Sequence, residues 1–149
     1  MIRETRGDLL HAEEDIIGHQ VNCFGVAGGL AAHVFRKWPA AYEDYLQVLR
    51  RLGPAEARIM LGHAQLTGQQ RDGKIIANLY GQYFPGRDYR PEMLTSAMWA
   101  LGDFARGTGR SVALPYGLSC GICGGDWRQV RSIIEDAMEG VPVTLYRLD

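Results

Sequence analysis

Residues Leu114–Trp127 read LPYGLSCGICGGDW, in which a short apolar strand leads into a glycine-rich loop and then a helix opened by Asp126. Glycine leaves no side chain where a backbone turns tightly or presses against a ligand. The glycines of this loop are Gly117, Gly121, Gly124 and Gly125. Backbone N–H groups that such a loop frees beside a helix N-terminus form a concave site for anions. The stretch therefore predicts a binding site for a phosphate or a diphosphate.

A second strand, loop and helix of the same kind lies upstream. From Asp15 to Phe35 the chain reads DIIGHQVNCFGVAGGLAAHVF, with Gly28 and Gly29 just before the expected helix. Two such loops in one small domain predict a ligand that is held from both sides.

The remaining elements alternate between strand and helix. Apolar runs predict strands over 16–22, 58–62, 74–80, 111–116 and 141–148. Most of these runs are apolar on both faces, which is typical of central strands covered by helices on each side. Helical spacing predicts helices over 28–34, over 40–52 behind Pro39, behind Pro91, and over 126–137. Asp126 and Gln129 have the spacing of a capping box.

This order of elements predicts a three-layer α/β/α sandwich with a central mixed, largely parallel sheet. In such folds ligands bind beyond the carboxyl ends of the strands, which is where both glycine loops fall. At 149 residues the chain is expected to form one domain, 1–149, with a substantial core.

Composition narrows the class of partner. The net charge of −1 argues against general nucleic-acid binding and against attraction to anionic membranes, but a single phosphorylated ligand remains compatible with it. We find no apolar run of membrane-spanning length and no signal-peptide core in MIRETRGD. Three cysteines in a chain without a secretion signal indicate a reducing compartment. We therefore expect a cytoplasmic protein, and a monomer.

Five motifs in this order resemble those of the macro domain, the ADP-ribose-binding fold. They are GDLL at 7–10, HQVNCFGVAGGLA at 19–31, ANLYGQY at 77–83, LPYGLSCGICGGDW at 114–127 and VTLYRL at 143–148. The chain is most similar to compact bacterial and phage-type macro domains, which are relatives of terminal ADP-ribose protein glycohydrolases and ADP-ribose 1''-phosphate phosphatases. The resemblance implies that the chain binds ADP-ribose or an ADP-ribosylated substrate, with no metal and no organic cofactor.

The resemblance also implies roles for individual residues. Asp8 accepts a hydrogen bond from the adenine amino group, Leu148 covers the adenine face, and Asn22 meets the hydroxyls of the distal ribose. Gly28 and Gly29 lie close to the distal ribose and the diphosphate. The other ligand-binding residues that it implies are Leu9, Val26, Leu30, Pro115, Gly117, Ser119, Cys120, Gly121, Ile122 and Cys123.

Catalytic residues are harder to assign. The glycohydrolase relatives use a lysine after the central strand and an aspartate in the second loop, and the resemblance aligns Gln82 and Cys123 with them. Glutamine cannot form a covalent adduct with the sugar, and cysteine replaces a general-acid carboxylate poorly. Our catalytic candidates are therefore His19, Asn22 and Asp88. A histidine can act as acid or base near neutral pH.

Two functions follow from these observations. As an enzyme, the chain would hydrolyse a substituent at C1'' of the distal ribose, either an ADP-ribosyl ester on protein or nucleic acid or a 1''-phosphate. The alternative is a reader that binds ADP-ribose without turnover. A more remote alternative is a thiol redox protein, because Cys120 and Cys123 form a CxxC motif. His19 also has a purely structural alternative as a hydrogen-bonded core histidine.

Overall fold

A six-stranded sheet organises the computed structural model, which describes residues 2–148. The strands are β1 (Ile2–Arg6), β2 (Ile16–Val21), β3 (Ala64–Leu66), β4 (Ile75–Tyr80), β5 (Val112–Pro115) and β6 (Val143–Arg147), in the spatial order β1-β6-β5-β2-β4-β3. All neighbouring strands are parallel except β3, which pairs antiparallel with β4 at one edge. The predicted mixed, largely parallel sheet is confirmed.

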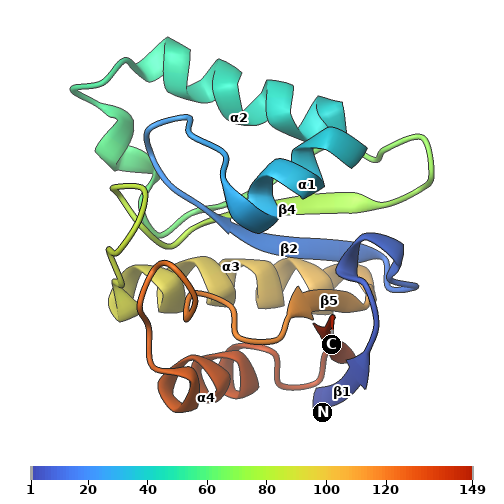
Figure 1. The fold of residues 1–149 in the computed structure, drawn as a ribbon. Helices are drawn as coiled ribbons and strands as arrows, with labels where there is room; N and C mark the ends of the chain where they lie inside the picture. The colour runs from blue at the N-terminus through green and yellow to red at the C-terminus, as the bar shows by residue number, and fades with distance from the viewer. Residues whose placement is uncertain (1, 149) are drawn as a thin grey trace.

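Helices cover both faces of this sheet, as Figure 1 shows. They are α1 (Gly29–Lys37), α2 (Pro39–Leu52), α3 (Pro91–Thr108) and α4 (Trp127–Ala137), with short 3-10 helices η1 (Leu9–His11) and η2 (Ala57–Met60). One buried cluster joins the sheet to α3 and α4, and a second joins its other face to α1 and α2. The predicted three-layer α/β/α sandwich is therefore confirmed. Among the described residues, no helix is both long enough and apolar enough to cross a membrane.

Local sequence explains where the helices begin. Pro39 and Pro91 occupy the first turns of α2 and α3, where the N–H that proline lacks has no partner within the helix. The Asp126 carboxylate caps α4 by accepting a hydrogen bond from the Arg128 amide at 3.0 Å. The capping box is only half formed, because Gln129 instead accepts a hydrogen bond from the Tyr89 hydroxyl.

One predicted strand is wrong, and the pattern predicted neither edge strand. The apolar run 58–62 forms part of η2 and a turn, in which Ile59 is 57% exposed. The strand on this side of the sheet is β3, three residues long and only half-buried. At the other edge, β1 reads IRETR, which is too polar for an apolar-run criterion but pairs with β6 along its whole length.

The topology places the two glycine loops together. β2 and β5 are neighbours in the sheet, with Ile16 opposite Val112 and Ile17 opposite Ala113. Because these strands are parallel, the loop after β2 and the loop after β5 leave the same edge of the sheet. Any site built from both loops therefore lies at the carboxyl ends of β2 and β5.

Candidate functional site

The first loop, residues 22–28, is held in shape by Asn22. Its Nδ2 donates a hydrogen bond to the Val26 carbonyl at 2.8 Å, and its Oδ1 accepts from the Phe24 amide at 2.9 Å and from the Tyr45 hydroxyl at 3.0 Å. The residue is 7% exposed. The loop conformation therefore depends on a carboxamide that offers both donor and acceptor.

The second loop, residues 116–126, is a series of tight turns. Gly117 has φ of 80°, and Ser119 is the one non-glycine among the described residues with a positive φ, at 68°. The Gly125 amide donates to the Ser119 carbonyl at 2.9 Å, and a Cβ on Gly125 would lie 2.6 Å from that oxygen. A left-handed serine at this point is backbone strain of the kind that gathers at binding sites.

Both loops line one small cavity of about 150 Å³, which we call the loop cavity. Asn22, Val26 and Gly28 reach it from the first loop, and Ile122 and Cys123 from the second. Its other lining residues are Gln20, Val21, Ala31, Gln82, Pro85 and Gly86. Among these described residues, no carboxylate and no amine faces the cavity.

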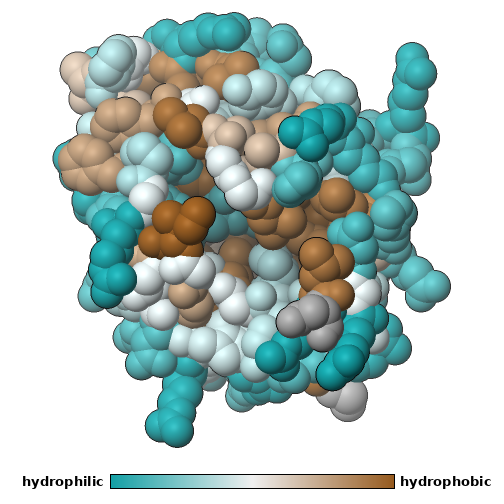
Figure 2. All heavy atoms as spheres, viewed as in Figure 1, coloured by the Kyte–Doolittle hydropathy of each residue, from teal (hydrophilic) through white to brown (hydrophobic). Residues whose placement is uncertain are grey.

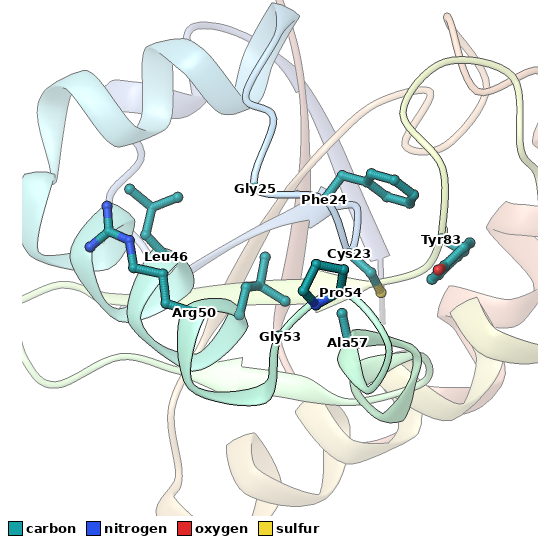
Figure 3. A pocket seen from close by; sticks show the side chains of 10 residues that line it. Cys23, Phe24, Gly25, Leu46, Arg50, Gly53, Pro54, Ala57 and Tyr83 are labelled. Atoms are coloured by element: carbon teal, nitrogen blue, oxygen red, sulfur yellow. The ribbon is translucent and has the colours of Figure 1, made fainter.

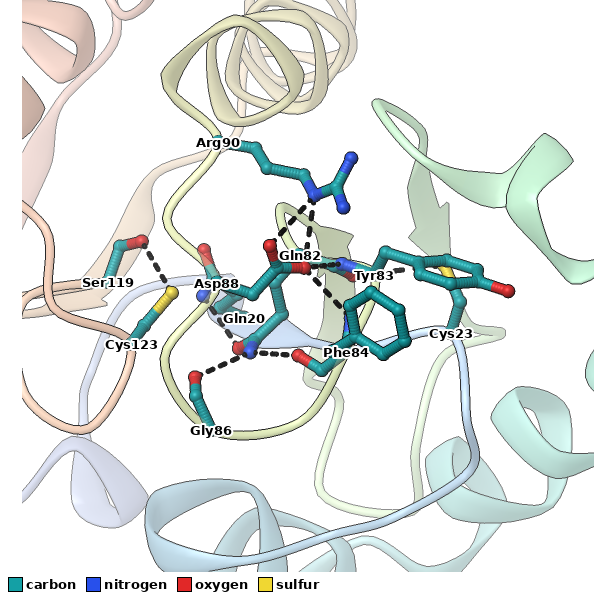
Figure 4. Close-up of polar contacts among 10 residues, drawn as sticks. All are labelled: Gln20, Cys23, Gln82, Tyr83, Phe84, Gly86, Asp88, Arg90, Ser119 and Cys123. Atoms are coloured by element: carbon teal, nitrogen blue, oxygen red, sulfur yellow. Dashed lines mark hydrogen bonds and ion pairs between the residues drawn. The ribbon is translucent and has the colours of Figure 1, made fainter.

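Hydrogen bonds fix the orientation of the Gln82 carboxamide at the wall of the loop cavity. Its Nε2 donates to the carbonyls of Phe84 at 2.6 Å and Gly86 at 3.1 Å, so its Oε1 must accept, and it does so from Gln20 Nε2 at 2.8 Å (Figure 4). This leaves Gln20 Oε1 buried with no partner among the described residues. This oxygen faces the Gly81 backbone, where an added Cβ would lie 2.3 Å from it.

A second cavity, of about 290 Å³, adjoins the first across the start of α1, and we call it the Asp8 cavity. Leu30 lines the Asp8 cavity, whereas Gly28 and Ala31 line the loop cavity. The other lining residues are Gly7, Asp8, Leu9, Pro115, Tyr116, Tyr146, Arg147 and Leu148. Figure 2, viewed from the same side as Figure 1, shows the molecule hollowed in the middle of this face.

The Asp8 cavity offers one carboxylate and an apolar cover. Asp8 accepts a hydrogen bond from the Leu10 amide at 3.0 Å and lies 3.3 Å from His11 Nδ1, while about 39% of its side chain stays exposed. Leu148 is 78% exposed, and the Arg147 guanidinium stacks 4.6 Å from the Tyr116 ring centre. A flat heterocycle with an amino group suits this combination of ring, apolar and acceptor surfaces.

The catalytic candidates do not all reach the loop cavity. Asn22 lines it, whereas His19 is 1% exposed, donates a hydrogen bond through Nε2 to Asn78 Oδ1 at 2.7 Å, and packs edge-on against Phe35. Burial lowers the pKa of His19 to about 4, although the Asn78 hydrogen bond opposes this shift. The ring is therefore neutral near pH 7 and lies in the core, which favours its structural alternative.

The Asp88 carboxylate is bonded to residues of the loop that follows β4. Its carboxylate accepts hydrogen bonds from the Tyr83 and Phe84 amides, each at 2.9 Å, and forms an ion pair with Arg90 at 3.0 Å. Partial burial raises the pKa of Asp88, but the bonds from Phe84, Arg90 and Tyr83 outweigh it and hold the pKa below its usual value. Asp88 lies outside the lining of both cavities and serves to shape the loop.

The predicted ligand-binding residues divide between the cavities. Asn22, Val26, Gly28, Ile122 and Cys123 share the loop cavity, and Asp8, Leu9, Leu30, Pro115 and Leu148 share the Asp8 cavity. Gly29, Gly117, Ser119, Cys120 and Gly121 line neither cavity and shape the loops between them. Sequence reasoning did not predict the other lining residues, which are Gly7, Gln20, Val21, Ala31, Gln82, Pro85, Gly86, Tyr116, Tyr146 and Arg147.

The CxxC motif lacks the geometry of a thiol redox site. α4 begins at Trp127, after both cysteines, so neither thiol lies at the N-terminus of the helix. Burial, followed by the charges of Asp126 and Cys123, raises the pKa of Cys120, which disfavours the reactive thiolate. Cys123 is buried and accepts the Ser119 hydroxyl at 3.7 Å. Within residues 2–148, no group of three or more histidine, cysteine or acidic side chains could hold a metal ion.

Comparison with known proteins finds a matching family model and several relatives. A family model described as "Macro domain" matches residues 19–134. The DNA ADP-ribosyl glycohydrolase of Mycobacterium tuberculosis is 31% identical over 149 residues, which cover 95% of this chain and 40% of that protein. The chain thus spans about two fifths of the length of this curated relative.

Solved structures of similar size match over nearly their whole length. A macrodomain protein from Streptomyces coelicolor is 30% identical with a TM-score of 0.81, and the match covers 98% of each chain. The macrodomain of Mycobacterium tuberculosis DarG is 28% identical with a TM-score of 0.82, covering 98% of this chain and 97% of that one.

Proposed function

This chain belongs to the macro domain family, and we propose that it binds ADP-ribose across its two cavities and hydrolyses a bond at C1'' of the distal ribose. Adenine occupies the Asp8 cavity, with its amino group donating to Asp8 and Leu148 over its face. The distal ribose occupies the loop cavity beside Asn22 and Gln20. The diphosphate crosses between them at the start of α1.

The observation that carries this proposal is the joining of the two cavities across one helix N-terminus. Gly28 caps α1 without a side-chain hydrogen bond, so amide groups of the first turn are free to bind phosphate oxygens. Helix N-termini carry a partial positive charge that favours anions. A diphosphate held there needs no basic side chain, which agrees with the net charge of −1.

Hydrolysis is supported by the relatives, which are named for glycohydrolase activity on ADP-ribosylated DNA. The resemblance aligns Gln82 and Cys123 with the lysine and the aspartate of the glycohydrolase relatives, and both side chains line the loop cavity. Without a lysine, water is the nucleophile: its oxygen bonds to C1'', the bond from C1'' to the leaving group breaks, and the leaving group takes a proton. The site contributes by holding the ribose beside Asn22 and Gln20.

Calorimetric titration with ADP-ribose, with AMP as control, tests binding. We expect micromolar affinity for ADP-ribose, about −8 kcal/mol, and much weaker binding of AMP. Equal affinities would contradict the assignment of the distal ribose to the loop cavity. Incubation with ADP-ribosylated single-stranded DNA and with ADP-ribose 1''-phosphate, followed by chromatography, then tests turnover.

A reader function is the second candidate, and the bonded state of Gln82 favours it. Its carboxamide has partners for both donors and for its acceptor, and the loop cavity has no ionisable carboxylate or amine among its described lining residues. Tight ADP-ribose binding without turnover of either substrate would establish the reader. Turnover that an Asn22→Ala variant loses while it still folds would establish the enzyme.

A further inference from the structure

Three aromatic rings form a half-exposed cluster beside the loop cavity, composed of Phe24, Tyr83 and Phe84. Ring centres lie 5.1 Å apart for Phe24 and Tyr83, 5.4 Å for Phe24 and Phe84, and 4.7 Å for Tyr83 and Phe84. Phe24 is 49% exposed and Phe84 is 50% exposed. Figure 2 shows apolar atoms gathered at the left of this face, over the loops that follow β2 and β4. Exposed phenylalanines held together in this way mark an interaction site.

Two arginine side chains lie over one ring of this cluster, and a third lines the cavity beside it. The Arg58 guanidinium carbon lies 4.2 Å from the centre of the Tyr83 ring, and that of Arg90 lies 5.8 Å from it. Arg50 lines an apolar cavity of about 400 Å³ beneath Phe24 and Tyr83, shown in Figure 3, and is the only charged residue in its lining. Arg90 pairs with Asp88, whereas Arg50 and Arg58 form no ion pair with any residue from 2 to 148.

The cluster is continuous with the site proposed for the distal ribose. Asn22 and Val26 line the loop cavity, and Cys23 to Gly25, between them in the chain, line the cavity under the cluster. The same alternation occurs after β4, where Gln82 and Pro85 face the loop cavity and Tyr83 faces the other one. Figure 4 shows Gln82 beside Tyr83 and Phe84. A molecule attached to a ribose in the loop cavity therefore lies next to the aromatic cluster.

We propose that the aromatic cluster, with Arg50 and Arg58, binds the single-stranded nucleic-acid segment that carries the ADP-ribosyl group. Bases stack on the exposed phenylalanines, and the two unpaired arginines contact backbone phosphates. This inference rests on the proposed function for the identity of the attached group. Aromatic rings and arginines that form no ion pair with residues 2–148, with no carboxylate in the lining of the cavity under the cluster, favour nucleic acid over a protein carrier. The surface is local, so it agrees with a chain that lacks a broad basic face.

Fluorescence anisotropy of a short labelled single-stranded oligodeoxynucleotide, titrated with the protein saturated with ADP-ribose, tests this inference. We expect Phe84→Ala and Phe24→Ala each to weaken binding about tenfold, the value of one stacked base. Arg58→Ala should also reduce the slope of log K against log salt concentration by about 0.7 in magnitude. This is the contribution of one phosphate contact to a single strand. A duplex of the same sequence should bind more weakly, because its bases are already stacked.

Matched controls lie on α3 and just after its end. Trp99 is 42% exposed under Arg106, and Arg110 lies over Phe104, so Trp99→Ala and Arg110→Ala remove the same kinds of group away from the cluster. Neither should change oligonucleotide affinity. Calorimetry of each variant with free ADP-ribose should give the parent affinity, since the cluster lies outside both ligand cavities.

Each outcome separates this inference from the proposed function. If ADP-ribose binds but the parent protein does not bind the oligonucleotide, or if Phe84→Ala and Arg58→Ala bind it as the parent does, the nucleic-acid surface is overturned and the ADP-ribose site stands. If an ADP-ribosylated peptide loses affinity in these variants and the oligonucleotide does not, the partner is a protein. If ADP-ribose itself fails to bind, the proposed function fails, and the oligonucleotide data still decide the surface.

Discussion

At the scale of single residues, Gln82 links the shape of the site to its chemistry. Its carboxamide joins Gln20 to the carbonyls of Phe84 and Gly86, and so ties the loop after β4 to strand β2. The same side chain lines the loop cavity, and the macro-domain resemblance aligns it with a lysine of the glycohydrolase relatives. A residue aligned with a catalytic position thus serves here to brace the cavity.

Replacing Gln82 tests this bracing role. Gln82→Leu leaves the two carbonyls and the Gln20 amide without partners, and we expect a loss of about 1–3 kcal/mol in the free energy of unfolding. Gln82→Lys should lose much less, because its ammonium can donate to the Phe84 and Gly86 carbonyls and, once the Gln20 carboxamide turns over, to Gln20 Oε1. Urea denaturation measures both values. Equal stability of the two variants would show that these hydrogen bonds do not hold the loop.

His19 gives a prediction about pH. Burial holds its pKa at about 4 in the folded protein, against 6.5 for an unperturbed histidine. Between these pH values the His19 ring therefore binds a proton in the unfolded chain but not in the folded chain. The contribution of His19 to the free energy of unfolding is fully present above pH 6.5. It falls by about 3 kcal/mol in total as the pH drops toward 4.

The His19→Gln variant removes this titration, so its free energy of unfolding should decline less steeply than that of the parent between pH 6.5 and 4. The same exchange at the exposed His33 is the matched control for replacing a histidine outside the core. ADP-ribose affinity at pH 7.5 should survive in His19→Gln if the ring is structural. A loss of affinity or turnover with unchanged stability would return His19 to the functional site.

At the scale of elements, α3 and α4 approach each other through one glycine. A Cβ placed on Gly102 would lie 2.1 Å from the Ala137 carbonyl oxygen, which is backbone and cannot move aside cheaply. Gly102→Ala should therefore cost about 1–3 kcal/mol or more through overpacking. At Gly107, which also lies on α3, an added Cβ would have no neighbouring heavy atom within 4 Å.

Gly107→Ala is therefore the matched control, and we expect it to stabilise the protein by about 0.5–1 kcal/mol because alanine restricts the unfolded chain. Thermal unfolding monitored by circular dichroism compares the two variants directly. Similar shifts of Tm in the same direction would contradict the close packing of α3 against α4.

The elements also show what the sequence could predict. Buried strands such as β2 and β4 are apolar on both faces, so pattern alone identified them to within a residue or so. The edge strand β1 is half exposed and polar, and only its pairing with β6 makes it a strand. The prediction of a strand over 58–62 is wrong for the opposite reason, because the apolar side chain of Ile59 faces solvent in η2.

The same limit applies to the candidate site. Glycine spacing and family motifs located both loops, since these features are local in the chain. Pattern could not show that Gln20 would meet Gln82 across β2 and the loop after β4, because that contact joins positions 62 residues apart. Nor could it separate a buried His19 from an accessible one, since burial depends on Phe35 of α1 packing over the ring.

At the scale of the whole molecule, the ligand face lies between the two layers of helices. The Asp8 cavity is lined from η1, α1, β5 and the end of β6. The loop cavity is lined from β2, α1 and the loops after β2, β4 and β5. A ligand that fills both cavities contacts elements packed on both faces of the sheet. ADP-ribose at a hundredfold excess over its Kd should therefore stabilise the fold by about 2.7 kcal/mol.

Hydrogen exchange distinguishes this bridging ligand from one that fills the Asp8 cavity alone. ADP-ribose should slow exchange of amides in both loops, 22–28 and 116–126, because their N–H groups and the α1 N-terminus then hold the diphosphate and the distal ribose. AMP, at concentrations adjusted to the same fractional saturation, should slow exchange only around Asp8 and the end of β6. If AMP protects the amides of Gly28 and Ile122 as strongly as ADP-ribose does, then the adenine and ribose positions are reversed, and Asp8 rather than Asn22 lies beside the bond that is broken.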